Sequence, residues 1–133
     1  MDNLYNIPQI RDFLEKQSDI KLVWVFGSVA KGDAGFDSDI DIAITTNNQL
    51  TADRKAELIS GIALIASRPV DLIDLNAADP VLMRQVLRKG KIIINKDSRF
   101  LAEMIKKYLF AMTDWQPYRE RILSERRRAW ISS

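Results

Sequence analysis

Apolar residues along this chain occur at two spacings, one typical of strands and one typical of helices. A continuous apolar run over residues 22–26 predicts a strand buried on both faces. Strict alternation over residues 39–44, with isoleucine at every second position, predicts a second strand whose isoleucines face the core. Shorter apolar segments predict a third strand over residues 70–75 and a fourth over residues 91–95.

Helical spacing separates these strands. A helix near the N-terminus has Pro8 in its first turn, and its apolar positions are Ile10, Phe13 and Leu14. Thr51 is a suitable N-cap for a longer helix that ends near Ser67. The apolar stripe expected on that helix comprises Ala52, Ala56, Ile59, Ala63 and Ala66.

Three further helices are expected in the second half of the chain. Asp79-Pro80 marks the start of one helix and Gly90 its end. Ser98 caps the next, whose apolar positions are Leu101, Met104, Ile105 and Tyr108. Pro117 opens a last helix toward Trp130. Strands and helices in this order predict an α/β (α+β) fold. We expect a single domain over residues 1–133, with a core at about 7–95 and a helical extension at about 98–130.

The helix over residues 51–67 predicts how the strands pair. A connection of this length suits a parallel crossover, which aligns the starts of the second and third strands. Asp71, the second residue of the third strand, would then lie level with Asp39 and Asp41. If the first two strands are antiparallel neighbours, Gly27 lies beside the same strand starts.

Composition excludes several kinds of chemistry. The chain has 133 residues, a formal net charge of +2, and neither cysteine nor histidine. Catalytic triads, thiolate nucleophiles and His- or Cys-based zinc sites are therefore excluded, and any metal ligand or base must be a carboxylate. The small net charge argues against direct nucleic-acid binding. The absence of cysteine fits a cytoplasmic protein, and we expect no signal peptide and no membrane span.

The most informative motif is Gly27-Ser28, followed after ten residues by Asp39-Ile40-Asp41. Alternate strand residues point to the same face, with Cα atoms about 6.6 Å apart. Two carboxylates so placed can share divalent cations, and paired metal ions hold the reacting oxygens in many phosphoryl transfers. Gly27 and Ser28 open a predicted short helix whose free N–H groups suit phosphate.

Two further residues extend this candidate site. Asp71 lies among apolar residues, which predicts a metal ligand and general base for an incoming hydroxyl. Lys31 is a candidate phosphate contact, although an ordinary surface lysine is an equal alternative. The arginine-rich segment 118–130 is typical of a solvated helix face, although a docking surface for a protein partner is an alternative and a nucleic-acid patch a weaker third.

These residues resemble the signature of the DNA polymerase β nucleotidyltransferase superfamily: Gly-Ser, a gap of about ten, Asp-x-Asp, and a later Asp. Gly27, Ser28, Asp39, Asp41 and Asp71 match it without departure, and the resemblance covers residues 7–95. The short length resembles that of minimal nucleotidyltransferases (MNT), which form toxin–antitoxin modules with HEPN-domain ribonucleases.

The resemblance implies a fold, a small mixed sheet flanked by helices, and it also implies a function. Two Mg²⁺ ions held by the three aspartates would bind ATP, with Gly27, Ser28 and Lys31 as nucleotide contacts. A tyrosine hydroxyl of a HEPN toxin would attack the α-phosphate, and the attached AMP would silence the ribonuclease. This is a Mg-dependent protein adenylyltransferase acting as an antitoxin. Two alternatives are a nucleotidyltransferase acting on a small molecule such as an aminoglycoside, and a non-catalytic antitoxin that occludes its partner.

Overall fold

The computed structural model describes residues 6–26 and 39–113. The chain divides into two compact units, Met1–Ser98 and Arg99–Ser133. The first contains a four-stranded sheet in the order β3-β2-β1-β4. In chain order the elements are α1 (Ile7–Glu15), β1 (Ile20–Phe26), β2 (Ile40–Thr46), α3 (Ala52–Ala66), β3 (Val70–Asp74), the 3-10 turn η1 (Leu75–Ala77), α4 (Pro80–Lys89) and β4 (Lys91–Asn95).

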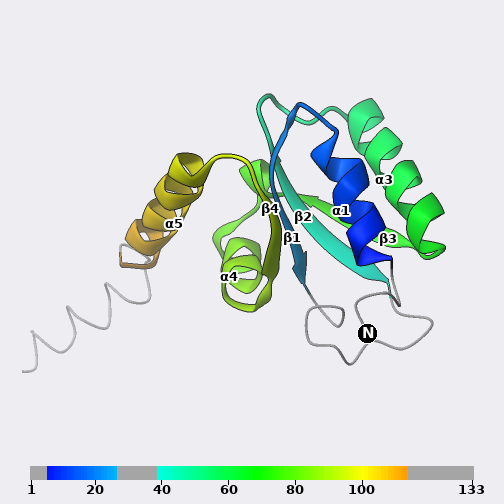
Figure 1. Cartoon of the computed structure of the whole chain (residues 1–133). Helices are drawn as coiled ribbons and strands as arrows, with labels where there is room; N and C mark the ends of the chain where they lie inside the picture. The colour runs from blue at the N-terminus through cyan, green and yellow to red at the C-terminus, as the bar shows by residue number, and fades with distance from the viewer. Residues whose placement is uncertain (1–5, 27–38, 114–133) are drawn as a thin grey trace, which may run out of the picture. The chain divides into compact units, whose positions relative to one another are not determined.

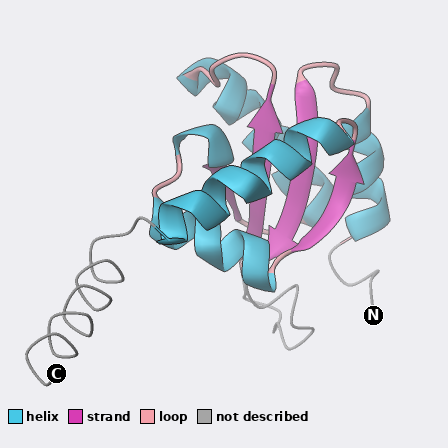
Figure 2. Ribbon diagram, turned by 90° about the vertical axis from the view of Figure 1, so that its left-hand side faces the viewer, coloured by secondary structure: helices cyan, strands magenta, loops and turns pink. Residues whose placement is uncertain are grey.

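The sheet is mixed, as predicted. β1 is antiparallel to both β2 and β4, whereas β2 and β3 are parallel and are joined through α3. Figures 1 and 2 show this arrangement, with α1 and α3 on one face of the sheet and α4 on the other. The predicted parallel crossover is confirmed, and the first two strands are antiparallel neighbours.

The main core lies between the sheet and the pair α1 and α3. Ile40, Ile42 and Ile44 of β2 are each 0% exposed and pack in this core, as the alternation predicts. From the helices come Ile10 and Leu14 of α1, together with Leu58 and Ile62 of α3. Burial of this many large apolar side chains is the main source of stability for a domain of this size.

The apolar stripe predicted for α3 is wrong in part. Thr51 caps the helix as expected, since its side chain accepts a hydrogen bond from the Arg54 N–H. However, Ala52 and Ala56 are exposed, and the buried residues are Leu58, Ile62 and Ala66. The buried face is therefore rotated by about one residue around the helix, at about 100° per residue.

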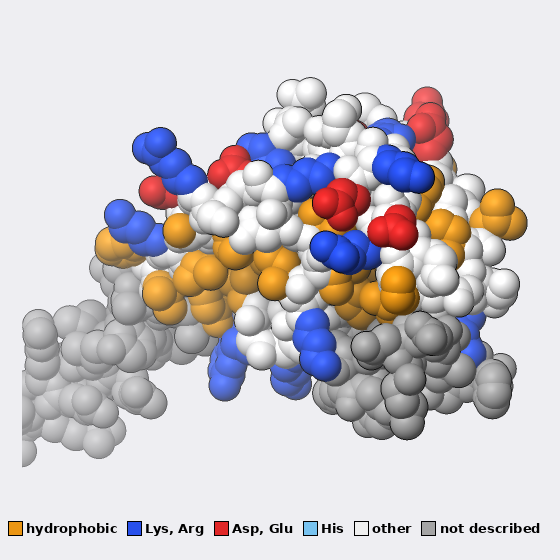
Figure 3. Space-filling model, viewed as in Figure 1, with side chains coloured by type: hydrophobic (Ala, Val, Ile, Leu, Met, Phe, Trp, Pro, Cys, Tyr) orange, Lys and Arg blue, Asp and Glu red, His pale blue; other side chains and the backbone are white. Residues whose placement is uncertain are grey.

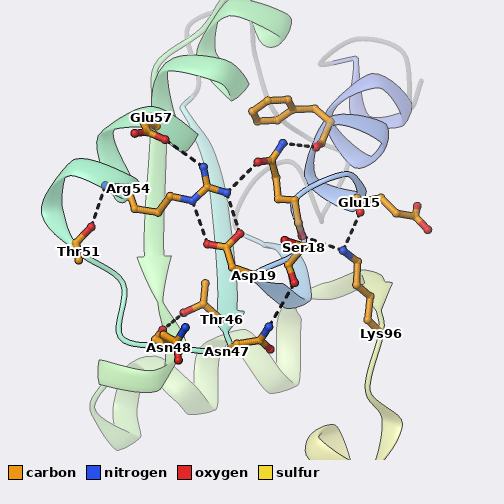
Figure 4. Close-up of polar contacts among 12 residues, drawn as sticks. Glu15, Ser18, Asp19, Thr46, Asn47, Asn48, Thr51, Arg54, Glu57 and Lys96 are labelled. Carbon is orange, nitrogen blue, oxygen red and sulfur yellow. Dashed lines mark hydrogen bonds and ion pairs between the residues drawn. The ribbon is translucent and has the colours of Figure 1, made fainter.

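A cluster of polar side chains joins elements at the end of the sheet where β1 begins (Figure 4). The Arg54 guanidinium donates to both carboxylate oxygens of Asp19, at 3.0 and 2.8 Å. It also donates to Gln17 and Glu57. Lys96 donates to the backbone carbonyls of Glu15 and Gln17. These contacts tie α3, β4 and the end of α1 to the start of β1.

We expect Asp19→Asn to lower the free energy of unfolding by about 1 kcal/mol at pH 7, at the low end for charge-assisted bonds because both side chains are about one-third exposed. The hydrogen bond from Arg54 lowers the pKa of Asp19. The Asp19–Arg54 contact therefore stabilises the fold fully when the pH is above the ordinary pKa of Asp19, 3.8. This stabilisation is lost as the pH falls through the lowered pKa that Asp19 has in the folded state. Urea unfolding at pH 7 and pH 3 tests this, with the exposed Asp12→Asn as control. A deficit as large at pH 3 as at pH 7 would contradict it.

The second unit contains α5 (Ser98–Thr113). Its start agrees with the helix predicted near Ser98, although Ser98 is the first helical residue rather than a cap. Ile105, Leu109 and Phe110 are 39%, 56% and 59% exposed. The predicted helix over residues 117–130 lies outside the described residues.

Candidate active site

Three strand ends meet at one end of the sheet, which we call the aspartate end. β1 ends there at Phe26, and β2 and β3 both begin there. Phe26 lies opposite Asp41 in the antiparallel pair, and Asp41 lies opposite Asp71 in the parallel pair. The expectation that Asp71 lies level with Asp41 is therefore confirmed.

Asp41 lies on the sheet face away from the main core. Its neighbours Ile40 and Ile42 are both 0% exposed and pack in that core. Because strand side chains alternate, Asp41 points to the opposite face, the one on which α4 lies. Asp41 is half-buried, whereas Asp39 and Asp71 are exposed. Asp71 is thus a solvent-accessible carboxylate beside a half-buried one.

The three carboxylates act on one another electrostatically. Burial raises the pKa of Asp41 above its ordinary value of 3.8, and the negative charges of Asp71 and Asp39 raise it further. Among the described residues, neither Lys nor Arg forms a salt bridge with any of the three. The negative charge of these three aspartates is therefore not neutralised by any of the salt bridges among the described residues.

This repulsion predicts a pH-dependent stability. A raised pKa means that the folded state holds its proton more tightly, so stability falls as the pH rises from about 3.8 through the raised value. We expect Asp41→Asn to raise the melting temperature by about 1–4 °C at pH 7, and to leave it unchanged at pH 3. Thermal melts at the two pH values test this. A large drop in melting temperature would instead mean that Asp41 has a structural role.

The donor set suits a hard divalent cation. Carboxylate oxygens are the ligands that Mg²⁺ prefers, and the uncompensated charge at Asp41 favours a cation there. Within residues 6–26 and 39–113, however, no group of three His, Cys, Asp or Glu side chains is arranged to hold a metal ion. The aspartates therefore fit Mg²⁺ in donor type and charge.

Three further residues belong to the site that the sequence predicts. Gly27, Ser28 and Lys31 lie outside the described residues.

Asp74, on the same strand as Asp71, is structural, because its side chain accepts a hydrogen bond from the Asn76 N–H at 3.0 Å. It lies at the opposite end of β3, which makes it a useful control for the candidate site.

Sequence reasoning overlooked one feature of the aspartate end. β4 begins there, because Lys91 pairs with Val25 near the end of β1. The last turn of α4 carries Arg88 and Lys89 immediately before it. Taken singly, such residues look like ordinary surface charges. Their position follows only from the antiparallel pairing of β4 with β1, which the sequence pattern did not specify.

The chain resembles several known proteins. A family model described as polymerase beta, nucleotidyltransferase matches residues 8–99. The protein adenylyltransferase MntA of Shewanella oneidensis is 36% identical over 85 residues. That match covers 64% of this chain and 59% of MntA, so the chain aligns with less than two thirds of the relative's length.

Two solved structures share the fold over most of the chain. One is a toxin–antitoxin complex with AMP-PNP, in which the matched chain has a TM-score of 0.72 and 27% identity, covering 92% of this chain and 97% of that one. The other is a tri-AMPylated Shewanella oneidensis HEPN toxin in complex with an MNT antitoxin, with a TM-score of 0.68 and 26% identity. That match covers 94% of this chain and 98% of the other.

Proposed function

Because this chain belongs to the polymerase beta nucleotidyltransferase family, whose model matches residues 8–99, we propose that it transfers AMP from ATP to a tyrosine hydroxyl of a partner HEPN toxin. In this role the chain is an antitoxin, and AMP on the tyrosine neutralises the ribonuclease. The observation that carries the proposal is the pairing of Asp41 with Asp71, with Asp39 close enough to raise the pKa of Asp41.

The proposed reaction needs no covalent bond to this chain. The tyrosine oxygen attacks the α-phosphorus of ATP and forms a new P–O bond. The bond from that phosphorus to the α–β bridging oxygen breaks, and pyrophosphate leaves. Asp71, exposed beside Asp41, takes the hydroxyl proton. Such transfers depend on positioning and charge neutralisation, which agrees with a chain that lacks His and Cys.

Asp39, Asp41 and Asp71 would hold two Mg²⁺ ions, which when bound neutralise the charge of the triphosphate. We assign the phosphates of ATP to Gly27, Ser28 and Lys31, which follow β1 in the sequence.

The relatives support the choice of substrate and partner. MntA is named a protein adenylyltransferase. One related complex contains AMP-PNP, and the other contains an AMPylated HEPN toxin bound to an MNT antitoxin. Together they favour ATP as the nucleotide and a toxin side chain as the acceptor. No helix among the described residues is long and apolar enough to cross a membrane. The lack of cysteine fits a reaction in the cytoplasm.

The direct test uses ATP labelled at either the α or the γ phosphate. The purified chain is incubated with Mg²⁺ and with the HEPN protein encoded beside its gene, and label on the partner is measured. We expect label from the α position only, because pyrophosphate carries the γ-phosphate away. Mass spectrometry of the labelled partner then identifies the acceptor residue.

Other outcomes point to the alternatives. Label from the γ position only would mean kinase chemistry and overturn the proposed reaction. A tight complex without transfer would indicate an antitoxin that neutralises by occlusion. Transfer to an aminoglycoside but not to the partner would identify a small-molecule nucleotidyltransferase.

A further inference from the structure

Asn6 is the residue at which the start of α1 meets the end of α3. Its backbone carbonyl accepts a hydrogen bond from the Ile10 N–H at 2.9 Å, in the first turn of α1. Its side-chain amide donates to the carbonyl of Ile65 at 2.8 Å, in the last turn of α3. The last four carbonyls of a helix have no partner within the helix, so this amide supplies one of them with a donor.

The backbone of Asn6 has the left-handed conformation, with φ 56° and ψ 41°. Asparagine adopts this conformation more readily than most residues that have a Cβ. One residue therefore meets two demands, a left-handed backbone before α1 and an amide that reaches α3. The bond joins residues 59 positions apart in the sequence, and Figure 1 shows both helix ends at the aspartate end of the sheet.

The turn that follows α3 is short and stiff. Ala66, the last residue of the helix, is buried in the main core, and β3 begins at Val70. Of the three residues between them, Ser67 has a left-handed backbone with φ 56°. The ring of Pro69 fixes its φ, and a residue before proline is restricted to extended conformations. A shift at the end of α3 is therefore passed on to Pro69 rather than absorbed by the turn.

Pro69 is in direct contact with the strand that carries two of the aspartates. Its carbonyl accepts a hydrogen bond from the Ile40 N–H at 3.0 Å, and Ile40 is the first residue of β2 that pairs with β3. Asp39 and Asp41 flank Ile40 in the sequence. Asp71 lies two residues after Pro69. The bond thus aligns the strand start that carries Asp71 with the strand start that carries the other two carboxylates.

We propose that Asn6 is a positioning residue of the candidate active site. Its amide holds the last turn of α3, and the turn after α3 then places Asp71 beside Asp41. This inference rests on the proposed function, because the quantity it affects is the rate of AMP transfer. Misplacement of reacting groups by about 1 Å can cost about a hundredfold in rate, even when the substitution lies far from the chemistry.

The Asn6 contact is electrically neutral, since it joins an amide to a backbone carbonyl. The opposite end of the sheet is held in part by charged groups. Arg54 pairs with Asp19 there, and Figure 3 shows Lys or Arg side chains next to Asp or Glu side chains toward the top of the view. Removal of the Asn6 amide leaves the charges around the aspartates unchanged, so a change in rate reports the positions of the three carboxylates.

The test compares Asn6→Gly with Asn76→Ala. Glycine adopts a left-handed backbone without strain, so Asn6→Gly removes the amide and keeps the backbone conformation. The control acts at the opposite end of the sheet, where the Asn76 amide donates to the Thr46 carbonyl at 3.2 Å. Each variant loses one partly buried bond from an amide to a carbonyl. We expect both melting temperatures to fall by about 2–6 °C.

Catalysis separates the two variants. AMP transfer to the HEPN partner is measured over a range of ATP concentrations, at a temperature where both variants are fully folded. We expect Asn6→Gly to lower kcat by about tenfold or more and to change the KM for ATP by less than about twofold, because the phosphates of ATP are assigned to residues after β1. We expect Asn76→Ala to leave both constants unchanged. An unchanged kcat in Asn6→Gly, or an equal fall in both variants, would overturn the proposal.

A second variant keeps the proposal testable if Asn6→Gly does not fold. Pro69→Ala keeps the carbonyl that binds the Ile40 N–H but makes the turn after α3 less stiff. The Pro69 side chain is exposed, so the core is untouched. We expect Pro69→Ala to lower kcat by about threefold or more. An unchanged kcat would mean that position is not transmitted through this turn, and the proposal would fail.

A measurement without catalysis decides the case in which the chain transfers no AMP. Native-state hydrogen exchange at the Ile40 N–H reports the bond to Pro69. We expect Asn6→Gly to raise this exchange rate by about fivefold relative to N–H groups in the middle of β1, and Asn76→Ala to leave the ratio unchanged. An unchanged ratio in Asn6→Gly would overturn the proposal. A raised ratio, with no transfer by the wild type, would overturn only the proposed function.

Discussion

Replacement of Asp41 by Asn is expected to lower the rate of AMP transfer to the partner by about a thousandfold or more. Under the proposed function, Asp41 is the carboxylate flanked by the other two, opposite Asp71 in register and close to Asp39. The amide keeps the shape of the side chain and removes its charge. Metal-assisted charge stabilisation contributes several kcal/mol to such transfers, and each 1.4 kcal/mol is about tenfold in rate.

The matched control is Asp74→Asn. It makes the same chemical change on the strand that carries Asp71, but at the opposite end of the sheet. The asparagine keeps an oxygen that can accept the hydrogen bond from the Asn76 N–H, so the turn after β3 should survive. Both variants are assayed for label transfer from α-labelled ATP and for protection of cells from the toxin. Full protection by Asp41→Asn would mean that occlusion is sufficient and that catalysis is not the function.

The sheet and the meeting of Asp41 with Asp71 could be predicted from the sequence because each rests on a strong local pattern. Alternating isoleucines fix which face of β2 is buried, and a one-residue shift would expose all of them. A helix between two strands implies a parallel crossover, and parallel pairing aligns the strand starts. The register of Asp41 with Asp71 then follows with little freedom.

Features that depend on tertiary packing were not predicted. Alanines suit both exposed and buried helix positions, so Ala52 and Ala56 do not specify which face of α3 is buried. Arg88 and Lys91 read as surface charges until the pairing of β4 with β1 brings them to the aspartate end.

Leu58→Ala is expected to lower the free energy of unfolding by about 2–5 kcal/mol, the range for truncating a buried leucine. Leu58 is 0% exposed and lies in the cluster between α3 and the sheet. The truncation leaves a cavity in the cluster of buried side chains to which Leu58 belongs. A single domain of this size has only about 5–15 kcal/mol of stability in total, so the loss is a large fraction of it.

Leu64→Ala is the control, because it makes the same truncation on the same helix at a side chain that is 84% exposed. We expect a change within about 0.5 kcal/mol. Urea unfolding of both variants therefore tests which face of α3 is buried, independently of any activity. If both variants lose the same free energy of unfolding, Leu64 is covered in solution. If only Leu64→Ala loses stability, the buried face of α3 is the one that carries Leu64, not Leu58. Because α3 connects β2 to β3, its packing also supports the register that brings Asp41 and Asp71 together.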